Sequence, residues 1–311
     1  MFLKNTLKLT FANASNIWKI LLYRFLCLLC VLGLTTVIAW PIINTLIKNN
    51  FFIDLQKSFE SMLFNLNFET LFLTVDNVLK NFVNIIANSG YIALAIFVVI
   101  FDVCLFSFLE EFASLAVHQS VGGYMSSLTK YGFTNSLVSN FGKATILALC
   151  RLFTTLVLNI LIWVGIYFMA SSLYKSIGVF AIVLTFFVAI VVISLKKSML
   201  SGLEPAYLIH NESVFNSFKH SLVVFKKFLK VLSSYLVLTL VVFVINIFAL
   251  TFTAGVGLFV TLPLTTLLYI ILEEVIYREL LGMRYYVDSD RIITPKKLEQ
   301  QDKFSKVKDI I

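Results

Sequence analysis

The sequence is poor in charged residues: Asp, Glu, Lys and Arg make up 14% of its 311 residues. Globular domains of soluble proteins carry about 25% of these residues, whereas 59% of this chain is hydrophobic. Such a composition excludes a soluble enzyme or carrier and indicates a membrane protein.

Cysteines are also few, and none of them suggests a disulfide framework. Cys27, Cys30, Cys104 and Cys150 all lie in or at the edge of apolar segments. The Cys-x-x-Cys spacing of the first two lacks the polar neighbours that a redox or zinc site needs, which favours small apolar side chains. The chain also lacks an ATP-binding glycine loop, a haem ligand pair and any cofactor fingerprint. We therefore predict no cofactor and no metal ion.

Six apolar segments are each long enough to cross a membrane as a helix. A spanning helix needs about 20 mostly apolar residues and makes all its backbone hydrogen bonds internally. The first segment is too long, and its basic leader too extended, for a cleaved secretory signal. We expect an all-α polytopic protein with one transmembrane domain over residues 1–281 and spans at about 25–44, 91–109, 152–171, 177–195, 231–253 and 257–276.

Basic residues predict the orientation, because short loops rich in Lys and Arg stay on the cytoplasmic side. Of the 25 basic residues, all but Lys48, Lys57, Lys80 and Lys175 fall in regions on one side of the six spans. We expect both termini to be cytoplasmic, in the cytoplasmic membrane of a bacterium, with the net charge of +8 facing anionic phospholipids. Membrane phospholipids are the expected partners and other membrane proteins are further candidates. No nucleic-acid-binding module is recognisable.

Three related segments lie just before the first, third and fifth spans. They begin at Asn5, Asn135 and Asn216, each with Asn, then Ser or Thr, then Leu or Phe, and each continues with helical spacing into a span. The pattern predicts three hairpins, each led by a cytoplasmic amphipathic helix; chance similarity in an Asn- and Phe-rich chain is the alternative. In the third copy we expect four lysines to contact lipid headgroups: Lys219, Lys226, Lys227 and Lys230.

The six spans and the basic segment ESVFNSFKHSLVVFKKFLKVL resemble a known membrane domain. This is the multi-span domain found alone or fused to bacterial glycerophosphoryl diester phosphodiesterases, together with its uncharacterised six-span relatives. The resemblance covers most of the chain and includes no catalytic motif. This sequence contains no soluble phosphodiesterase domain, so the resemblance implies the membrane architecture and not that activity.

Two parts of the chain lie outside the predicted spans. Residues 45–90 carry apolar stripes at helical spacing, which predict extracytoplasmic amphipathic helices that form either a lid over the bundle or a cover for its rim. Residues 282–311 are polar and basic and contain one proline. We expect them to be a cytoplasmic tail that forms a short surface helix or a disordered extension.

Asp102 is the strongest candidate for a functional charge within the membrane. It lies near the middle of the second predicted span, where an ionised side chain costs at least about 2.5 kcal/mol unless it is paired or hydrated. Arg151, Arg24 and Lys143 are the candidate partners. Two interpretations stand side by side: an ion or proton pathway, and a hydrogen-bonded carboxyl that holds helices together.

Glu273, Glu274 and Arg278 match the Glu-Glu-x-x-x-Arg first motif of the CAAX-type membrane peptidases. In that family the glutamate activates a water, and histidines on later helices complete the site. No histidine follows Arg278 in this sequence. All three histidines precede the motif, in segments that we expect to be cytoplasmic loops: His118, His210 and His220.

The same motif has an ordinary structural interpretation. Glu274 and Arg278 are spaced for an i,i+4 ion pair at the polar end of the last span. Tyr277, Tyr285 and Tyr286 would then be anchors at the membrane interface. A metal site is not predicted at the inner end of the second span, because the helical spacing there does not gather a tight ligand set from Glu110, Glu111 and His118.

These observations favour a non-enzymatic function. We expect a lipid-interacting protein or an accessory subunit of a membrane assembly. The second hypothesis is a transporter of ions or small solutes that uses Asp102. The third is a membrane peptidase that uses Glu273 and Glu274.

Overall fold

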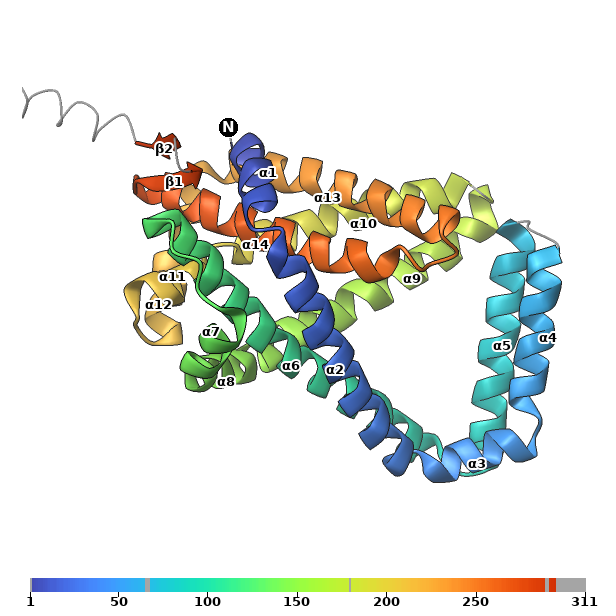
Figure 1. The fold of residues 1–311 in the computed structure, drawn as a ribbon. Helices are drawn as coiled ribbons and strands as arrows, with labels where there is room; N and C mark the ends of the chain where they lie inside the picture. Colours follow the sequence, from blue (N-terminus) through green and yellow to red (C-terminus); the bar gives the residue numbers. More distant parts are fainter. Residues whose placement is uncertain (1, 65–67, 179, 289–290, 295–311) are drawn as a thin grey trace, which may run out of the picture. The chain divides into compact units, whose positions relative to one another are not determined.

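A computed structural model describes residues 2–64, 68–178, 180–288 and 291–294, and this part of the chain is almost entirely helical (Figure 1). Within it, six helical stretches are long and apolar enough to cross a membrane. The prediction of an all-α polytopic protein is confirmed at this level. The stretches are Ser15–Ile38, Ile92–Ser127, Phe141–Tyr174, Phe180–His210, Val214–Phe252 and Leu258–Leu281.

The chain divides into two compact units, where the sequence predicts a single transmembrane domain. One unit comprises the residues up to Arg24 together with those from Phe108 onward, and the other comprises Phe25–Ser107. Helices α2 (Ser15–Ile38) and α6 (Ile92–Ser127) each run from one unit into the other. We refer to the first as the main unit and to the second as the 25–107 unit.

The 25–107 unit contains α3 (Trp40–Lys48), α4 (Phe51–Phe64) and α5 (Phe68–Asn88), so helices are present in the segment where apolar stripes predict them. Its core is formed by Ile42, Leu46, Phe51 and Ile86. The first predicted span, residues 25–44, does not coincide with one helix, because α2 begins at Ser15 and ends at Ile38. Pro41 lies in the first turn of α3, where its missing N–H costs nothing and a new helix direction can begin.

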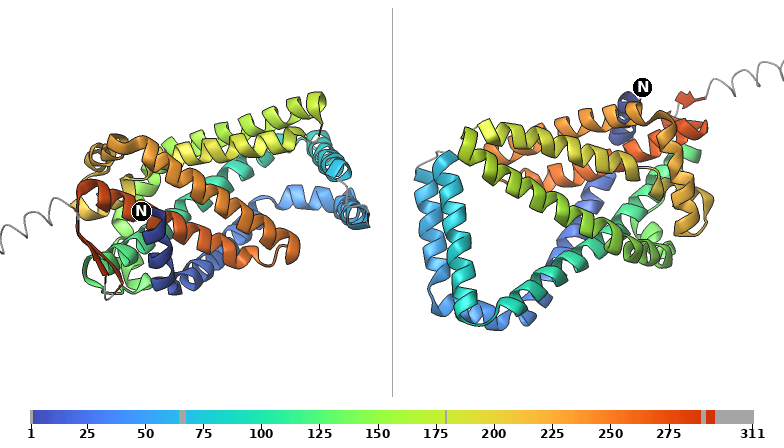
Figure 2. Two further views of the ribbon diagram at one scale, coloured as in Figure 1. Left: turned by 90° about the horizontal axis from the view of Figure 1, so that it is seen from above. Right: turned by 180° about the vertical axis from the view of Figure 1, so that it is seen from behind.

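The main unit contains the other spanning helices, and Figure 2 shows three of them side by side, with α10 in contact with both α9 and α13. Helix α14 is central: 61% of the residues in its apolar 18-residue segment are buried, against 6–22% in the corresponding segments of the other five stretches. It ends at Gly282, which adopts φ +70° and donates its N–H to the Arg278 carbonyl, the left-handed cap that glycine allows. Besides the short helices described below, the main unit contains α7 (Phe133–Ser139), α8 (Phe141–Arg151), α9 (Val157–Ile177), α10 (Phe180–Leu200), α11 (Leu203–His210), α13 (Phe228–Phe252) and α14 (Leu258–Leu281).

Short helices precede three of the spanning helices, where the repeated segments lie. They are α1 (Phe2–Ala12), α7 with α8, and α12 (Val214–Ser221) with the 3-10 helix η2 (Leu222–Lys227). In every copy the residue after the repeated Asn is a small polar residue that is buried, and so is the residue four positions later. Because i and i+4 share one helix face, these positions support a real repeat: Thr6 and Thr10, Ser136 and Asn140, Ser217 and Ser221.

Part of the tail forms β-strands, where the sequence predicts a surface helix or a disordered extension. Strands β1 (Tyr285–Asp288) and β2 (Arg291–Ile293) pair antiparallel. Tyr285 and Val287 are buried and belong to the hydrophobic core of the main unit. The Tyr285 hydroxyl donates to Glu279 Oε1 at 2.8 Å and accepts from Asn5 Nδ2 at 2.8 Å. Strand β1 therefore packs against α1 and α14, and Tyr285 is a core residue and not an interface anchor.

Close packing between α11 and α12 leads to a stability prediction. A Cβ atom at Gly202 would lie 2.9 Å from the Ser221 carbonyl oxygen and 3.0 Å from Ser221 Cα, so backbone would have to move. We expect Gly202→Ala to destabilise the protein by about 1–3 kcal/mol, as overpacking does. The measurement is thermal unfolding in detergent. Gly165→Ala is the control, because nothing lies within 4 Å of its Cβ position and alanine favours a helix interior.

Candidate functional site

A group of ionisable side chains converges inside the main unit, and we call it the buried ion cluster. It draws on α6, on the end of α8, on α11 and on α14, helices that are far apart in the sequence. Charged side chains in protein interiors are almost always paired, and here each has at least one partner of opposite charge or an imidazole. The members are Glu111, His118, Arg151, Glu204, Glu273, Glu274 and Arg278.

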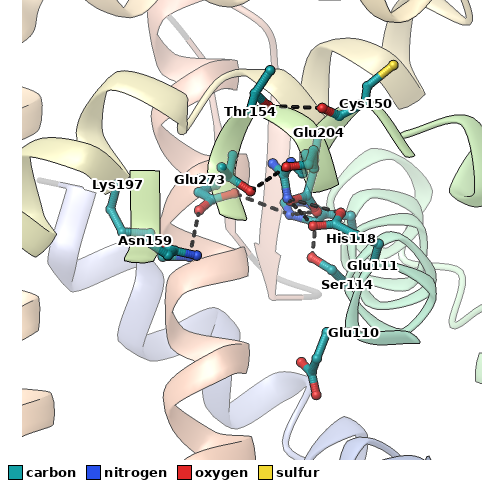
Figure 3. Close-up of polar contacts among 12 residues, drawn as sticks. Glu110, Glu111, Ser114, His118, Cys150, Thr154, Asn159, Lys197, Glu204 and Glu273 are labelled. Carbon is teal, nitrogen blue, oxygen red and sulfur yellow. Dashed lines mark hydrogen bonds and ion pairs between the residues drawn. The ribbon is translucent and has the colours of Figure 1, made fainter. Parts of the chain in front are cut away.

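His118 is the centre of the cluster, with Glu204 and Glu273 beside it (Figure 3). Its side chain is 0% exposed. Its Nδ1 lies 3.0 Å from Glu274 Oε1. Its Nε2 lies 2.9 Å from Glu204 Oε2 and 3.4 Å from Glu273 Oε2, yet neither contact has hydrogen-bond geometry. Three carboxylates thus surround one imidazole.

Arg151 connects Glu204 to a second acid. The last residue of α8, it contacts Glu204 and lies 3.0 Å from Glu111 Oε1. Glu204 also accepts a hydrogen bond from the Ser114 hydroxyl at 2.6 Å. The π-helical turn η1 (Leu152–Leu156) follows Arg151 directly, and π-turns of this kind often mark functional positions in helices.

Arg278 occupies the other end of the cluster. Its Nε donates to Glu274 Oε2 at 3.2 Å, and its other nitrogens donate to Ser126 Oγ at 3.0 Å and to the Gly122 carbonyl at 3.1 Å. The expected i,i+4 pair therefore exists, but its side chains are only 5% and 1% exposed. The pair expected at the polar end of the last span is thus buried, and so is Tyr277, which we expected to be an interface anchor.

Two polar cavities border the cluster within the main unit. A cavity of about 330 Å³ is lined by His118, Glu274 and Arg278 together with residues of the α6 end. A second cavity of about 210 Å³ is lined by Glu204 and Glu273 together with charged residues of α6, α8 and α10. His118 therefore borders the first cavity, and Glu204 and Glu273 border the second.

An apolar groove lies beside the same cluster, and we call it the α8 groove. Its volume is about 520 Å³, and Arg151 is its one charged lining residue among those described. The Nε atom of Arg151 is buried and has no hydrogen-bond partner. The remaining lining residues come from α8, η1, α9, α10, α11 and α12: Leu147, Cys150, Thr154, Thr155, Leu158, Leu200, Leu203, Val214, Phe215 and Phe218.

The structure gives each predicted charge of the membrane core a partner other than the expected one. Asp102 accepts a hydrogen bond of 2.5 Å from Thr35 Oγ1 within the 25–107 unit. Arg24 binds Glu110 at 2.6 Å and donates to Thr266 on α14. Asp102 and Arg24 thus each have a partner within their own unit. The contact with Thr35 is of the kind that joins helices, and the transport interpretation stays a prediction.

The four lysines predicted to contact lipid are all exposed. Lys219 lies over the Phe215 ring, with Nζ 4.8 Å from its centre, and Lys230 lies 4.5 Å from the centre of the Phe2 ring. Lys226 and Lys227 lie in η2 between them. Lys219 is therefore next to Phe215, a residue of the α8 groove.

Sequence reasoning missed His118 and Glu204 as partners of the glutamate pair. His118 was expected in a loop, but it lies inside α6, which continues well past the predicted span. One signal could have found the cluster: leucine followed by two charged residues recurs at Leu109, Leu195 and Leu272, once in the second helix of each repeat unit. These positions place Glu111, Lys197 and Glu273 at the cluster.

Comparisons were made with protein-family models, with curated proteins and with solved structures. None of the three gives a match to this sequence.

Proposed function

We propose that the protein is a non-enzymatic, lipid-binding component of a bacterial cytoplasmic membrane, with both termini cytoplasmic. Six helices suited to crossing a membrane support the location. The asymmetric distribution of Lys and Arg supports the orientation. The ligand is a phospholipid, alone or at a contact with another membrane protein.

The α8 groove is the observation that carries this proposal. It combines an apolar lining between helices with a single cation, Arg151, whose Nε lacks a hydrogen-bond partner. An acyl chain fits the apolar lining, because each methylene that it buries there contributes about 0.8 kcal/mol to the binding free energy. The ester or phosphate oxygen of the same lipid supplies the acceptor that Arg151 Nε lacks, and such an acceptor matters because an unsatisfied buried donor costs about 1–3 kcal/mol.

The basic segment supplies the second part of the argument. Phe215 and Phe218 on α12 line the groove, and Lys219 lies over the Phe215 ring. A headgroup phosphate at the groove would therefore meet a lysine, and each Lys or Arg near an anionic surface contributes about 1 kcal/mol. An anionic phospholipid fits this combination better than a neutral one.

Blocking the groove tests the proposal. We expect Cys150→Trp to lower lipid occupancy by about thirtyfold, because an indole that displaces two or three methylenes removes about 2 kcal/mol of binding free energy. The measurement is native mass spectrometry of the protein extracted in mild detergent and mixed with a fixed amount of phosphatidylglycerol. Leu149→Trp is the matched control, since Leu149 is the exposed neighbour of Cys150 and does not line the groove.

The outcomes separate cleanly. One bound phospholipid in the wild type and in Leu149→Trp, and none in Cys150→Trp, supports the proposal. Equal occupancy in all three proteins contradicts it and places the bound lipid elsewhere on the surface.

A further inference from the structure

We infer that His118, Glu204 and Glu273 form a site for one divalent transition-metal ion, of which Zn²⁺ is the test case. The inference goes beyond lipid binding and does not depend on it. The three residues come from α6, α11 and α14, so the ion would join three helices that are distant in the sequence. One imidazole and two carboxylates are ligands that Zn²⁺ and its first-row neighbours accept.

The unpartnered nitrogen of His118 is the first argument. Glu274 also receives a hydrogen bond from Arg278, so this carboxylate is an acceptor and His118 Nδ1–H donates to it. Nε2 then has a lone pair that faces two further acceptors, Glu204 Oε2 and Glu273 Oε2, and no hydrogen bond forms there. Metal-bound histidines commonly donate their other N–H to a carboxylate in this way. Glu274 is thus the orienting residue and not a ligand.

The distances are the second argument. One ligand atom from each of the three residues can be chosen so that all lie within 4.8 Å of one another. The two contacts at Nε2, 2.9 and 3.4 Å, agree with the separation of about 3.0–3.5 Å between neighbouring ligands that metal bonds of about 2.0–2.2 Å produce. A small ion therefore fits with little movement of the side chains.

The charges are the third argument. Four carboxylates of the cluster face three cationic side chains, namely Arg151, Arg278 and the more exposed Lys197. With a neutral imidazole, the cluster has an excess of negative charge in an interior where isolated charge is costly. A divalent cation between Glu204 and Glu273 removes the repulsion between these carboxylates. The two cavities, one lined by His118 and the other by Glu204 and Glu273, provide its entry path.

The experiment uses the full-length protein in mild detergent, stripped with EDTA and dialysed against buffered Zn²⁺, with bound metal read by elemental analysis. We expect one Zn²⁺ per chain in the wild type. Co²⁺ in place of Zn²⁺ should give visible absorption bands of a site with nitrogen and oxygen ligands. A wild type that takes up no ion under these conditions overturns the inference.

Two glutamate variants test the assignment of the ligands. Glu273→Gln should weaken Zn²⁺ binding by more than about 100-fold, the upper end of the loss seen when only an orienting residue is changed. Glu273 suits this test because its other partner, Lys197, is 3.8 Å away and 41% exposed, so loss of the charge leaves little else unpaired. Glu110→Gln is the matched control, because Glu110 binds Arg24 and not His118.

The alternative to a metal ion is a proton on His118, which would make the cluster a purely structural ion network. That alternative expects equal, negligible uptake of Zn²⁺ by the wild type and by both variants. It also expects no rise in the melting temperature when Zn²⁺ is added to the stripped wild type. Either a missing rise or equal uptake by Glu273→Gln and Glu110→Gln contradicts the metal site.

Discussion

Replacing Arg151 with methionine should lower the free energy of unfolding by about 3–5 kcal/mol. The guanidinium is the shared partner of Glu111 and Glu204, and the side chains of both glutamates are largely buried. Methionine keeps much of the volume but leaves two carboxylates without their cation, and removal of one partner from a buried ion pair has a cost of this size. Thermal unfolding of the purified protein in detergent measures the effect.

Arg24→Met is the matched control for this substitution. Arg24 also binds a glutamate of α6, but the side chains of that pair are 24% and 27% exposed, against 15% and 4% for Arg151 and Glu204. Partly hydrated ion pairs contribute about 0–1 kcal/mol, so the control should change stability little. Equal losses in the two variants would show that the cluster is no more desolvated than the pair at Arg24. The double variant Arg151→Met with Glu204→Gln should be more stable than Arg151→Met alone, because it no longer buries the charge of Glu204 without its cation.

Tyr285→Ala should destabilise the main unit by about 3–5 kcal/mol, the cost of truncating a large buried aromatic side chain. Tyr285 is 1% exposed and belongs to the same hydrophobic core as Phe2 and Leu9 on α1. Ile292→Ala is the control within the same hairpin, because Ile292 is 51% exposed and its loss should cost little. If both variants unfold like the wild type, the hairpin is not docked in solution.

Tyr285→Phe isolates the hydroxyl group and predicts a dependence on pH. The variant leaves Asn5 and Glu279 without the bonds that they make to Tyr285, which costs about 1–3 kcal/mol near neutral pH. Burial and the nearby Glu279 raise the pKa of Tyr285 above its usual 10.0. A raised pKa means that this stabilisation is fully present below pH 10.0 and is lost as the pH rises toward the higher folded value. The difference in free energy of unfolding between the wild type and Tyr285→Phe should therefore decrease as the pH rises above 10.0.

The spanning helices could be predicted from sequence because their signal is local. A long apolar run must be helical in a membrane, and each of the six predicted runs overlaps one of the six helical stretches that are long and apolar enough to cross a membrane. Their ends were harder to place. The predicted second span ends at residue 109, just before two glutamates, yet α6 continues to Ser127, because charged residues in a helix interior are tolerated when other helices pair with them.

The site could be predicted only in fragments. Glu273, Glu274 and Arg278 were visible as a motif because they lie close together in the sequence of one helix. His118 and Glu204 were not, since their relation to that motif depends on how α6, α11 and α14 pack. A lone histidine or a lone glutamate near the end of a span has no pattern of its own. The recurring pair of charges after leucine connects α6, α10 and α14, but it does not include Glu204 on α11.

The wide spacing of the cluster along the chain has a consequence for biosynthesis. His118 and its partner Glu274 are 156 residues apart, and ribosomes add about 5–20 residues per second, so about 10–30 s separate their synthesis. Throughout that interval the nascent chain holds His118, and later Glu204, without the glutamates of α14. Insertion of α14 is thus the step that completes the cluster, and a chain that stalls before it holds the His118 imidazole without Glu274, the partner of its Nδ1.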